Sequence, residues 1–203
     1  DWSSDVCSSD LDLARRFPYF SRQAIGASFS PKDGSANPRL IAPAFAEAAR
    51  KAGVTLIDHA GNCTVRKTAE GFEVTTTKGM FAADRLLNCA GAWGAGLAAT
   101  FNEYVPLIAR GPQMGVTEPL PFKISPVVGA WSTDPGGDCY FRQVERGNIV
   151  FGGAAERTEV DLATGHAKAD PARLPRQLTA LVRLLPALAD VSVIRTWSGY
   201  EGY

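Results

Sequence analysis

Small residues and a helix start follow an apolar run near the middle of the chain. The run Arg85–Asn88 leads into Cys-Ala-Gly-Ala-Trp-Gly-Ala-Gly at residues 89–96. A strand that ends in glycines and opens a helix lets backbone N–H groups approach an anion, because small residues leave the main chain uncovered. The segment therefore indicates phosphate or dinucleotide binding, although Gly91, Gly94 and Gly96 do not have the G-x-G-x-x-G spacing.

A tyrosine and an arginine two positions apart form the second candidate. Tyr140 and Arg142 lie in an alternating run that predicts a strand, so both side chains project to the same face. A phenol hydroxyl and a guanidinium that meet in a cleft can hold a carboxylate, since arginine offers a bidentate fork. The alternative is a cross-strand surface pair without a ligand.

Other common chemistries are disfavoured by the residues present. The sequence has no Walker loop, G-x-S-x-G elbow or H-E-x-x-H motif, and its histidines are His59 and His166. Cys63, Cys89 and Cys139 lie far apart without C-x-x-C spacing, which argues against a zinc site or a disulfide framework. We therefore expect no metal site and a reducing, cytoplasmic compartment, and the catalytic residues stay unassigned.

The elements that must position these residues begin with a helix. Asn37 can cap it, Pro38 suits its first position, and Gly53 can end it. The apolar residues 54–58 predict a short strand after it, which makes half of an α/β unit. Three further strands are expected in the segments 63–68, 72–77 and 79–91, with turns at Glu70-Gly71 and Lys78-Gly79.

The second half of the chain predicts antiparallel strands and one helix. Residues 140–156 indicate two strands joined at Arg146–Asn148. Leucines at helical spacing between residues 171 and 188 indicate an amphipathic helix, and residues 191–203 a final strand. The predicted fold class is therefore α/β with mixed α+β character.

Composition excludes some partners. The 45% hydrophobic and 21% charged content is that of a globular protein, and no apolar run is long enough to cross a bilayer. The 21 basic and 21 acidic residues balance, so the charge does not indicate nucleic acid as a partner.

Residues 1–11 raise a separate question. Their Ser- and Asp-rich sequence has neither helical nor strand periodicity, which predicts a loop. The codons that can be written back for Asp1–Leu11 also spell one continuous piece of a common short-read sequencing adapter. We therefore interpret this stretch as a non-native scar and expect the native chain to begin further upstream.

The order of the motifs resembles a known family. The stretches "DGSANP", "LLNCAGAW", "RGPQM", "CYFRQVERGNIVFGG" and "RTWSGYEG" are similar in order and spacing to the D-amino acid oxidase superfamily of FAD-dependent oxidoreductases. Members of this superfamily include glycine oxidase and sarcosine oxidase, and the chain most resembles the flavin subunits of hydrogen cyanide synthase and opine oxidase. The resemblance implies FAD as cofactor.

The same resemblance implies which residues approach FAD. The backbone of Cys63, or of Asn62 if the alignment slips by one residue, would pair with adenine, and the backbone of Ala90, Gly91 and Trp93 would pass close to the cofactor. Cys63 can instead be an ordinary strand residue and Trp93 a core aromatic.

On the substrate side, the resemblance implies that the strand of Tyr140 and Arg142 faces the flavin, and that Trp197 belongs to a Trp-Ser-Gly motif beside the site. Glycine-oxidase-like members place an arginine where this sequence has Glu201. An acid there would repel a substrate carboxylate, which puts a simple D-amino acid substrate in doubt.

Four segments follow from this comparison. Residues 1–11 would be the scar, 12–36 a segment leading into the substrate domain, 37–102 a partial FAD-binding α/β domain, and 103–203 an antiparallel-sheet substrate domain truncated at its C-terminus. The G-x-G-x-x-G loop and a second flavin-contacting stretch would lie outside the sequence, so we expect the fragment by itself to hold FAD weakly and to be inactive.

The expected activity of the whole protein is oxidation of a C–N bond in an amine or amino acid to an imine, by hydride transfer to the flavin. The alternatives are a flavin dehydrogenase subunit of a multi-subunit complex and a non-catalytic subunit that retains the fold. The expected partners are a small amine or amino-acid substrate and further subunits.

Overall fold

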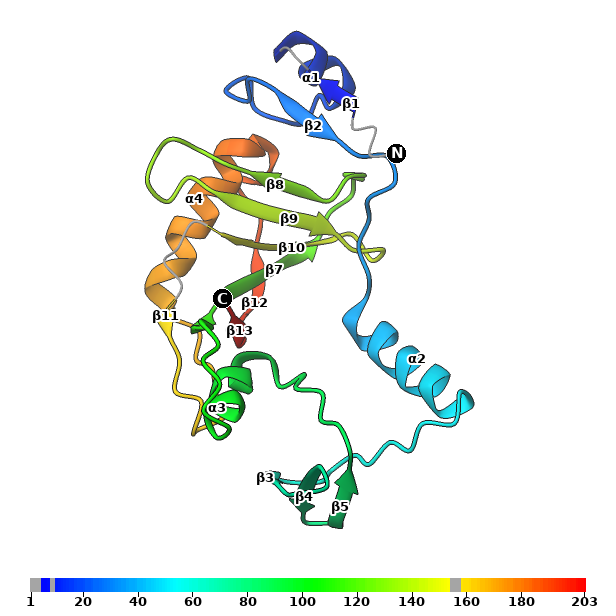
Figure 1. The fold of residues 1–203 in the computed structure, drawn as a ribbon. Helices are drawn as coiled ribbons and strands as arrows, with labels where there is room; N and C mark the ends of the chain where they lie inside the picture. Colours follow the sequence, from blue (N-terminus) through cyan, green and yellow to red (C-terminus); the bar gives the residue numbers. More distant parts are fainter. Residues whose placement is uncertain (1–4, 8–9, 154–157) are drawn as a thin grey trace. The chain divides into compact units, whose positions relative to one another are not determined.

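The computed structural model describes residues 5–7, 10–153 and 158–203 (Figure 1). Contacts divide the chain into two compact units. Unit 1 contains residues 1–35 and 110–201, and unit 2 contains residues 36–109 and 202–203. Each is described separately. Helices and antiparallel sheets occur in both, which confirms the mixed α and β class.

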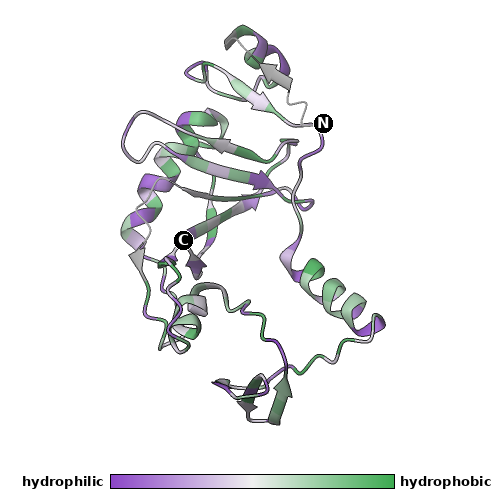
Figure 2. Ribbon diagram, in the orientation of Figure 1, coloured by the Kyte–Doolittle hydropathy of each residue, from purple (hydrophilic) through white to green (hydrophobic). Residues whose placement is uncertain are grey.

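Unit 2 begins with the predicted helix, α2 (Pro38–Lys51). The Asn37 side chain accepts a hydrogen bond from the Arg39 N–H at 3.0 Å, and Pro38 occupies the first turn, where its missing N–H costs nothing. Gly53 follows with φ of +88°, a left-handed conformation that favours glycine. Hydrophobic residues occur along much of this helix (Figure 2).

The predicted three-stranded meander is also present. It consists of β3 (Thr64–Lys67), β4 (Phe72–Thr76) and β5 (Gly79–Ala83), paired antiparallel in that order. At the first turn, a Cβ on Gly71 would lie 2.4 Å from the Ala83 carbonyl oxygen, so only glycine fits there. The turn residues thus set the pairing, as the sequence predicts.

One predicted strand of unit 2 does not form, and another is shorter than predicted, since the strand expected over 79–91 ends at Ala83. Residues 54–58 and 85–88 have no strand conformation, and both segments run as irregular chain. A strand is stable only when a neighbouring strand accepts its hydrogen bonds. Within the described residues neither segment is paired in a sheet, so apolar character by itself gave a wrong prediction here.

The segment after 85–88 does open a helical region, as predicted. A 3₁₀ turn, η1 (Gly91–Trp93), continues directly into α3 (Gly94–Ala99).

The prediction of a loop over residues 1–11 is partly wrong. Residues Asp5–Cys7 form β1, which pairs antiparallel with β2 (Ala27–Phe29), and α1 (Asp10–Arg16) includes the end of the stretch. Pairing with a segment twenty residues away is a tertiary effect that local periodicity does not report. The rest of this stretch lies outside the described residues.

The main body of unit 1 is a five-stranded antiparallel sheet in the order β12-β7-β10-β9-β8. Its strands are β7 (Gln113–Pro119), β8 (Val128–Ala130), β9 (Cys139–Gln143), β10 (Asn148–Gly153) and β12 (Val193–Ser198). The predicted hairpin at residues 146–148 joins β9 to β10, where Gly147 has φ of +93°. A short separate sheet has the order β11-β6-β13, from Thr158–Glu159, Ala109–Gly111 and Glu201–Gly202.

One face of the five-stranded sheet packs against the predicted amphipathic helix, α4 (Leu174–Leu184), which is preceded by η2 (Pro171–Arg173) and followed by η3 (Pro186–Leu188). Strand residues and helix leucines share this core: Phe141, Ile149, Phe151, Leu181, Leu185 and Leu188 are all fully or almost fully buried. Because side chains alternate along a strand, the neighbours of these residues point to the opposite face.

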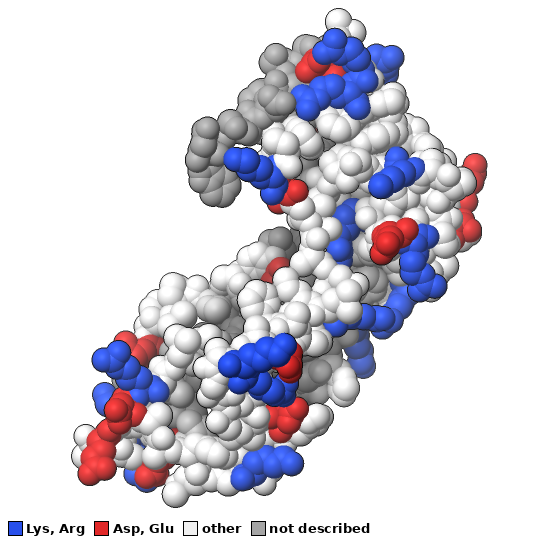
Figure 3. All heavy atoms as spheres, turned by 90° about the vertical axis from the view of Figure 1, so that its right-hand side faces the viewer, with Lys and Arg blue, Asp and Glu red and all other residues white. Residues whose placement is uncertain are grey.

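Charged residues lie on the surface with both signs mixed. On the face drawn in Figure 3, Lys and Arg side chains lie among Asp and Glu side chains. In the part of the chain that is described, no helix has the length and apolarity needed to cross a membrane.

Candidate active-site face

The sheet face opposite α4 carries two rows of aligned side chains. Residues directly opposite one another on antiparallel strands point to the same side, so the strand register defines each row. The first row, from β8 to β12, consists of Gly129, Tyr140, Gly152, Met114 and Trp197. The second, from β9 to β12, consists of Arg142, Val150, Val116 and Arg195. Three of the predicted substrate residues therefore share one surface.

Tyr140 lies across the first row. Its hydroxyl is 3.2 Å from Met114 Sδ, and a Cβ on Gly152 would lie 2.5 Å from the tyrosine Cζ and Oη atoms. The ring therefore needs glycine beneath it, and it reaches over β10 towards β7. The tyrosine is 38% exposed, so part of its side chain can be reached from above the sheet.

Arginines stand in the second row. Arg142 is half-buried on β9, beside the apolar Val150, and Arg195 occupies the edge strand β12. The Arg195 guanidinium lies 5.8 Å from the centre of the Trp197 ring, a cation–π distance. The face thus combines an apolar floor of valine, methionine and aromatic rings with positive charge, a surface on which a small carboxylate-bearing molecule can be oriented.

Glu201 lies elsewhere. It is exposed and begins β13, in the separate sheet with β6 and β11, so it belongs to neither row. The strand register joins Trp197 to Tyr140 through Met114 but does not join Glu201 to them.

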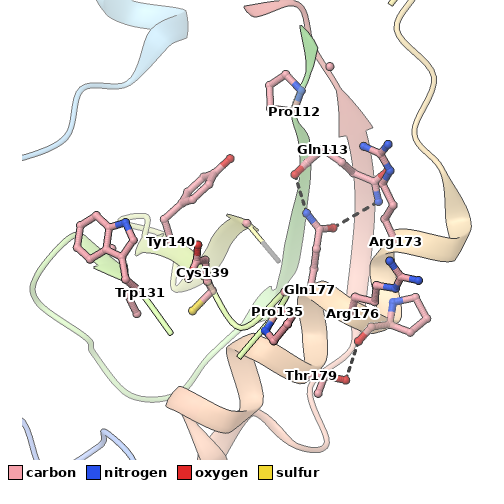
Figure 4. A pocket seen from close by; sticks show the side chains of 17 residues that line it. Pro112, Gln113, Trp131, Pro135, Cys139, Tyr140, Arg173, Arg176, Gln177 and Thr179 are labelled. Carbon is pink, nitrogen blue, oxygen red and sulfur yellow. Dashed lines mark hydrogen bonds between the residues drawn. The ribbon is translucent and has the colours of Figure 1, made fainter. Parts of the chain in front are cut away.

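A cavity of about 1070 Å³ opens at the beginning of β9, beside Cys139 and Tyr140, within unit 1. In Figure 4, Trp131 and Tyr140 lie on one side of it and Arg173 and Arg176 on the other. Between them, the almost fully buried Gln113 and Gln177 are hydrogen bonded: Gln113 Nε2 donates to Gln177 Oε1 at 3.3 Å, and Gln177 Nε2 donates to the Gln113 carbonyl at 2.7 Å.

These two glutamines fix the cavity wall. The Gln113 side-chain oxygen also accepts from the Asp170 N–H at 2.7 Å, at the start of η2. Because buried amides that lack partners are costly, this network holds the beginning of β7 and the first turns of α4 in one arrangement.

Cys139 lies beneath the same cavity, and its thiol is 2% exposed beside the Ala180 carbonyl. Burial, with a smaller contribution from the Asp138 charge, raises the pKa of Cys139 from 9.0 to about 11. The neutral thiol is therefore favoured in the folded protein, and the stability that it contributes is complete below pH 9 and lost as the pH rises towards 11.

We expect Cys139 to resist alkylation. At pH 8, iodoacetamide should modify the exposed Cys63 and Cys89 much faster than Cys139, because the thiolate is the nucleophile and Cys139 is both shielded and protonated. Peptide mapping by mass spectrometry over time measures the three rates in one sample. Equal modification rates for the three thiols in the native protein, without any denaturant, would contradict the burial of Cys139.

The predicted cofactor residues lie in unit 2. Ala90, Gly91 and Trp93 form the turn that becomes η1, and Gly91 has φ of +55° with no atom within 4 Å of a Cβ built on it. The Asn88 side chain fastens this turn, since its Nδ2 donates to the Gly94 carbonyl at 2.9 Å and its Oδ1 accepts from the Ala90 N–H at 3.2 Å. The open backbone at Gly91 fits the close approach of a flavin nucleotide.

Asn62 and Cys63 lie before β3, in another part of unit 2. The preceding segment is anchored by Thr77, whose N–H and hydroxyl both donate to the Ala60 carbonyl at 2.9 Å. The Cys63 thiol is exposed and lies 3.6 Å from the Gly61 carbonyl. Their position at the start of the meander leaves the backbone accessible, and their pairing with adenine stays a prediction.

Several site residues were not found from the sequence. Met114, Gly152 and Arg195 join the rows only through strand pairing, and Asn88 was taken for the end of a strand although it fastens the glycine turn. A signal was available for Gly152, because a glycine inside a strand often marks a close approach of another group. Among the described residues, no group of three or more His, Cys, Asp or Glu side chains could hold a metal ion.

Comparison with known proteins identifies the family to which the chain belongs. The family model described as FAD dependent oxidoreductase matches residues 5–202. The chain is 31% identical over 192 residues to hydrogen cyanide synthase subunit HcnC of Pseudomonas protegens, covering 90% of this chain and 42% of that protein. It is 24% identical to the glycine oxidase of Geobacillus kaustophilus, covering 90% of this chain and 46% of that one.

The fold is shared with solved structures. The L-proline dehydrogenase of P. horikoshii superposes with a TM-score of 0.83 at 22% identity, over 97% of this chain and 52% of that one. The chain thus spans about half the length of the relatives that it matches.

Proposed function

The chain belongs to the family of FAD dependent oxidoreductases, and from this premise we propose that it is part of an enzyme that oxidises the C–N bond of an amine or amino acid. The single observation that supports this activity most directly is the pair of rows on the open sheet face. They place Tyr140, Arg142 and Trp197 on one surface, above an apolar floor.

In this proposal, the substrate lies over the sheet face. Arg142 offers a two-pronged hydrogen bond to the substrate carboxylate, and the Tyr140 hydroxyl donates a further one. Met114, Val116 and Val150 exclude water from beneath the reacting carbon. Val116 and Val150 form the floor between the two arginines, and Met114 lies in the neighbouring row beside Trp197. Trp197, held by the Arg195 cation, closes the side of the face at β12.

The backbone of Ala90, Gly91 and Trp93, with Asn62 or Cys63, is proposed to hold FAD. When bound, FAD supplies the chemistry of hydride acceptance from the carbon that carries the amine. The substrate loses that hydride and the nitrogen loses a proton, which leaves a C=N bond. Water then adds to this bond and releases a carbonyl compound together with ammonia, or with an amine when the nitrogen carries a second carbon substituent. No acid–base side chain is assigned, because the role proposed for these residues is to orient the substrate and to exclude water.

The substrate and the assembly are also proposals. Glu201 is an acid where glycine-oxidase-like members carry an arginine, which argues against recognition of a simple glycine-like carboxylate. One relative is named as a synthase subunit, which favours partner subunits for this protein as well. A reducing, cytoplasmic compartment is supported by Cys63, Cys89 and Cys139, which are all free thiols.

The test is to extend the coding sequence at its source locus, to express the protein encoded there and to titrate it anaerobically with amines and amino acids. We expect bound flavin whose visible absorbance bleaches when a substrate is added. Readmission of air then separates an oxidase, which produces peroxide, from a dehydrogenase, which needs another acceptor. A protein that binds no flavin, or whose flavin no amine reduces, would refute the proposed activity and favour a non-catalytic subunit.

A further inference from the structure

Trp131 is the most exposed aromatic side chain of the cavity, at 86%. Its ring lies against Gly129, where a Cβ would come within 3.4 Å of the indole Cη2. Gly129 pairs directly with Tyr140 in the strand register, so Trp131 continues the first row beyond the tyrosine. An isolated exposed aromatic needs no explanation, but this one extends the substrate face into a cavity.

The loop that carries Trp131 is held in place. The Ser132 N–H donates to Asp138 Oδ1 at 2.8 Å, and the Gly137 N–H donates to the Asp134 carbonyl at 2.9 Å. Arg183 of α4 also pairs with the Asp134 carboxylate at 2.5 Å. Hydrogen bonds within the loop and the ion pair with α4 therefore hold the loop in one conformation, so the indole is already in position before a ligand binds.

The opposite wall is polar, and several of its groups are bonded to one another. The Arg173 guanidinium lies 3.5 Å from the Asp170 carboxylate, so its charge already has a partner, and the amide groups of Gln113 and Gln177 satisfy one another. The cavity volume of about 1070 Å³ is slightly above the range for small-molecule sites, which is roughly 300–1,000 Å³. A substrate of glycine size would leave most of it to water.

We propose that Trp131 is a specificity-determining residue that stacks against a large apolar, and best an aromatic, side chain of the amine substrate. This inference rests on the proposed function. Arg142 and Tyr140 would hold the polar end of the substrate on the sheet face, and the remainder would extend past Tyr140 into the cavity beside the indole. Ring stacking there adds to the area removed from water.

The experiment compares glycine with both enantiomers of phenylalanine and both enantiomers of glutamate as substrates of the flavin-loaded full-length protein. We expect kcat/KM to be highest for phenylalanine. Trp131→Ala should lower that value by about tenfold or more while leaving kcat/KM for glycine unchanged, and Trp131→Phe should retain most of the preference. Tyr104→Ala is the matched control, because Tyr104 is 88% exposed and lies outside the cavity.

A binding measurement keeps this inference separate from the proposed activity. Calorimetric titration with phenylacetate and with acetate needs no turnover, and we expect tighter binding of phenylacetate that Trp131→Ala removes. Equal binding of the two acids, a preference for glycine or glutamate, or an equal effect of Trp131→Ala on glycine and phenylalanine would overturn the inference. A flavin that no amine reduces, together with selective phenylacetate binding, would refute the activity alone.

Discussion

Replacement of Phe151 by alanine is expected to lower the free energy of unfolding by about 3–5 kcal/mol. Phe151 is 0% exposed, lies on the central strand β10, and packs in the core between the sheet and α4. Its removal leaves a cavity that neighbouring strands cannot fill, because they are fixed by their hydrogen bonds on both sides. Urea unfolding of the purified protein, followed by circular dichroism, measures the loss.

Gly115 provides a sharp control for this contact. A Cβ on Gly115 would lie 2.3 Å from the Phe151 Cζ atom, so Gly115→Ala alone should destabilise the protein by about 1–3 kcal/mol through overpacking. In the double variant with Phe151→Ala, the new methyl group enters the space that the ring has vacated. The two changes together should therefore cost less than the sum of the single effects, and strict additivity would show that Phe151 does not press on Gly115.

Replacement of Arg142 by methionine is expected to lower kcat/KM for an amino-acid substrate by about 10- to 100-fold, since a hydrogen bond to a charged group contributes about 1.5–3 kcal/mol. Methionine keeps the length and apolar volume of the side chain but removes the fork that would bind the carboxylate. The effect should fall mainly on KM if the contact is equally strong in the ground and transition states.

The decisive comparison is between an amino acid and its decarboxylated amine. Arg142→Met should weaken the reaction of the first and leave that of the second almost unchanged, and Arg142→Lys should restore only part of the loss because it lacks the planar fork. Arg146→Met is the control, since Arg146 is an exposed arginine in the β9–β10 turn. An equal loss for both substrates would mean that Arg142 supports the sheet and does not bind a carboxylate.

Local signals in the sequence were sufficient for α2, for the meander β3–β5 and for the β9–β10 hairpin. In each, a capping side chain or a turn glycine acts on residues within a few positions, as Asn37 does on Arg39 and Gly147 does between the hairpin strands. The alternation of β9 likewise predicted that Tyr140 and Arg142 share a face, and the register places them on one.

The wrong predictions concern strands that depend on distant partners. Residues 54–58 and 85–88 are apolar enough for strands, yet no described strand pairs with them, whereas Asp5–Cys7 has no strand pattern and pairs with Ala27–Phe29. Strand formation depends on a neighbour's hydrogen bonds, and periodicity carries no information about which neighbour is present. The predicted domain boundaries and the interpretation of residues 1–11 as a scar stay predictions.

By itself, then, the sequence determined the local elements, the family resemblance and the side chains able to bind a carboxylate, because each of these depends on residue type and short spacing. Only the tertiary structure decided which strands are neighbours. It set β7 between β10 and β12, which brings Met114 under Tyr140 and Trp197 into the same row, and it placed Trp131 beside the cavity. Such contacts join residues up to 85 positions apart, as Ser198 and Gln113 are. They form only when the burial of a shared core offsets the entropy of closing the long loops between them.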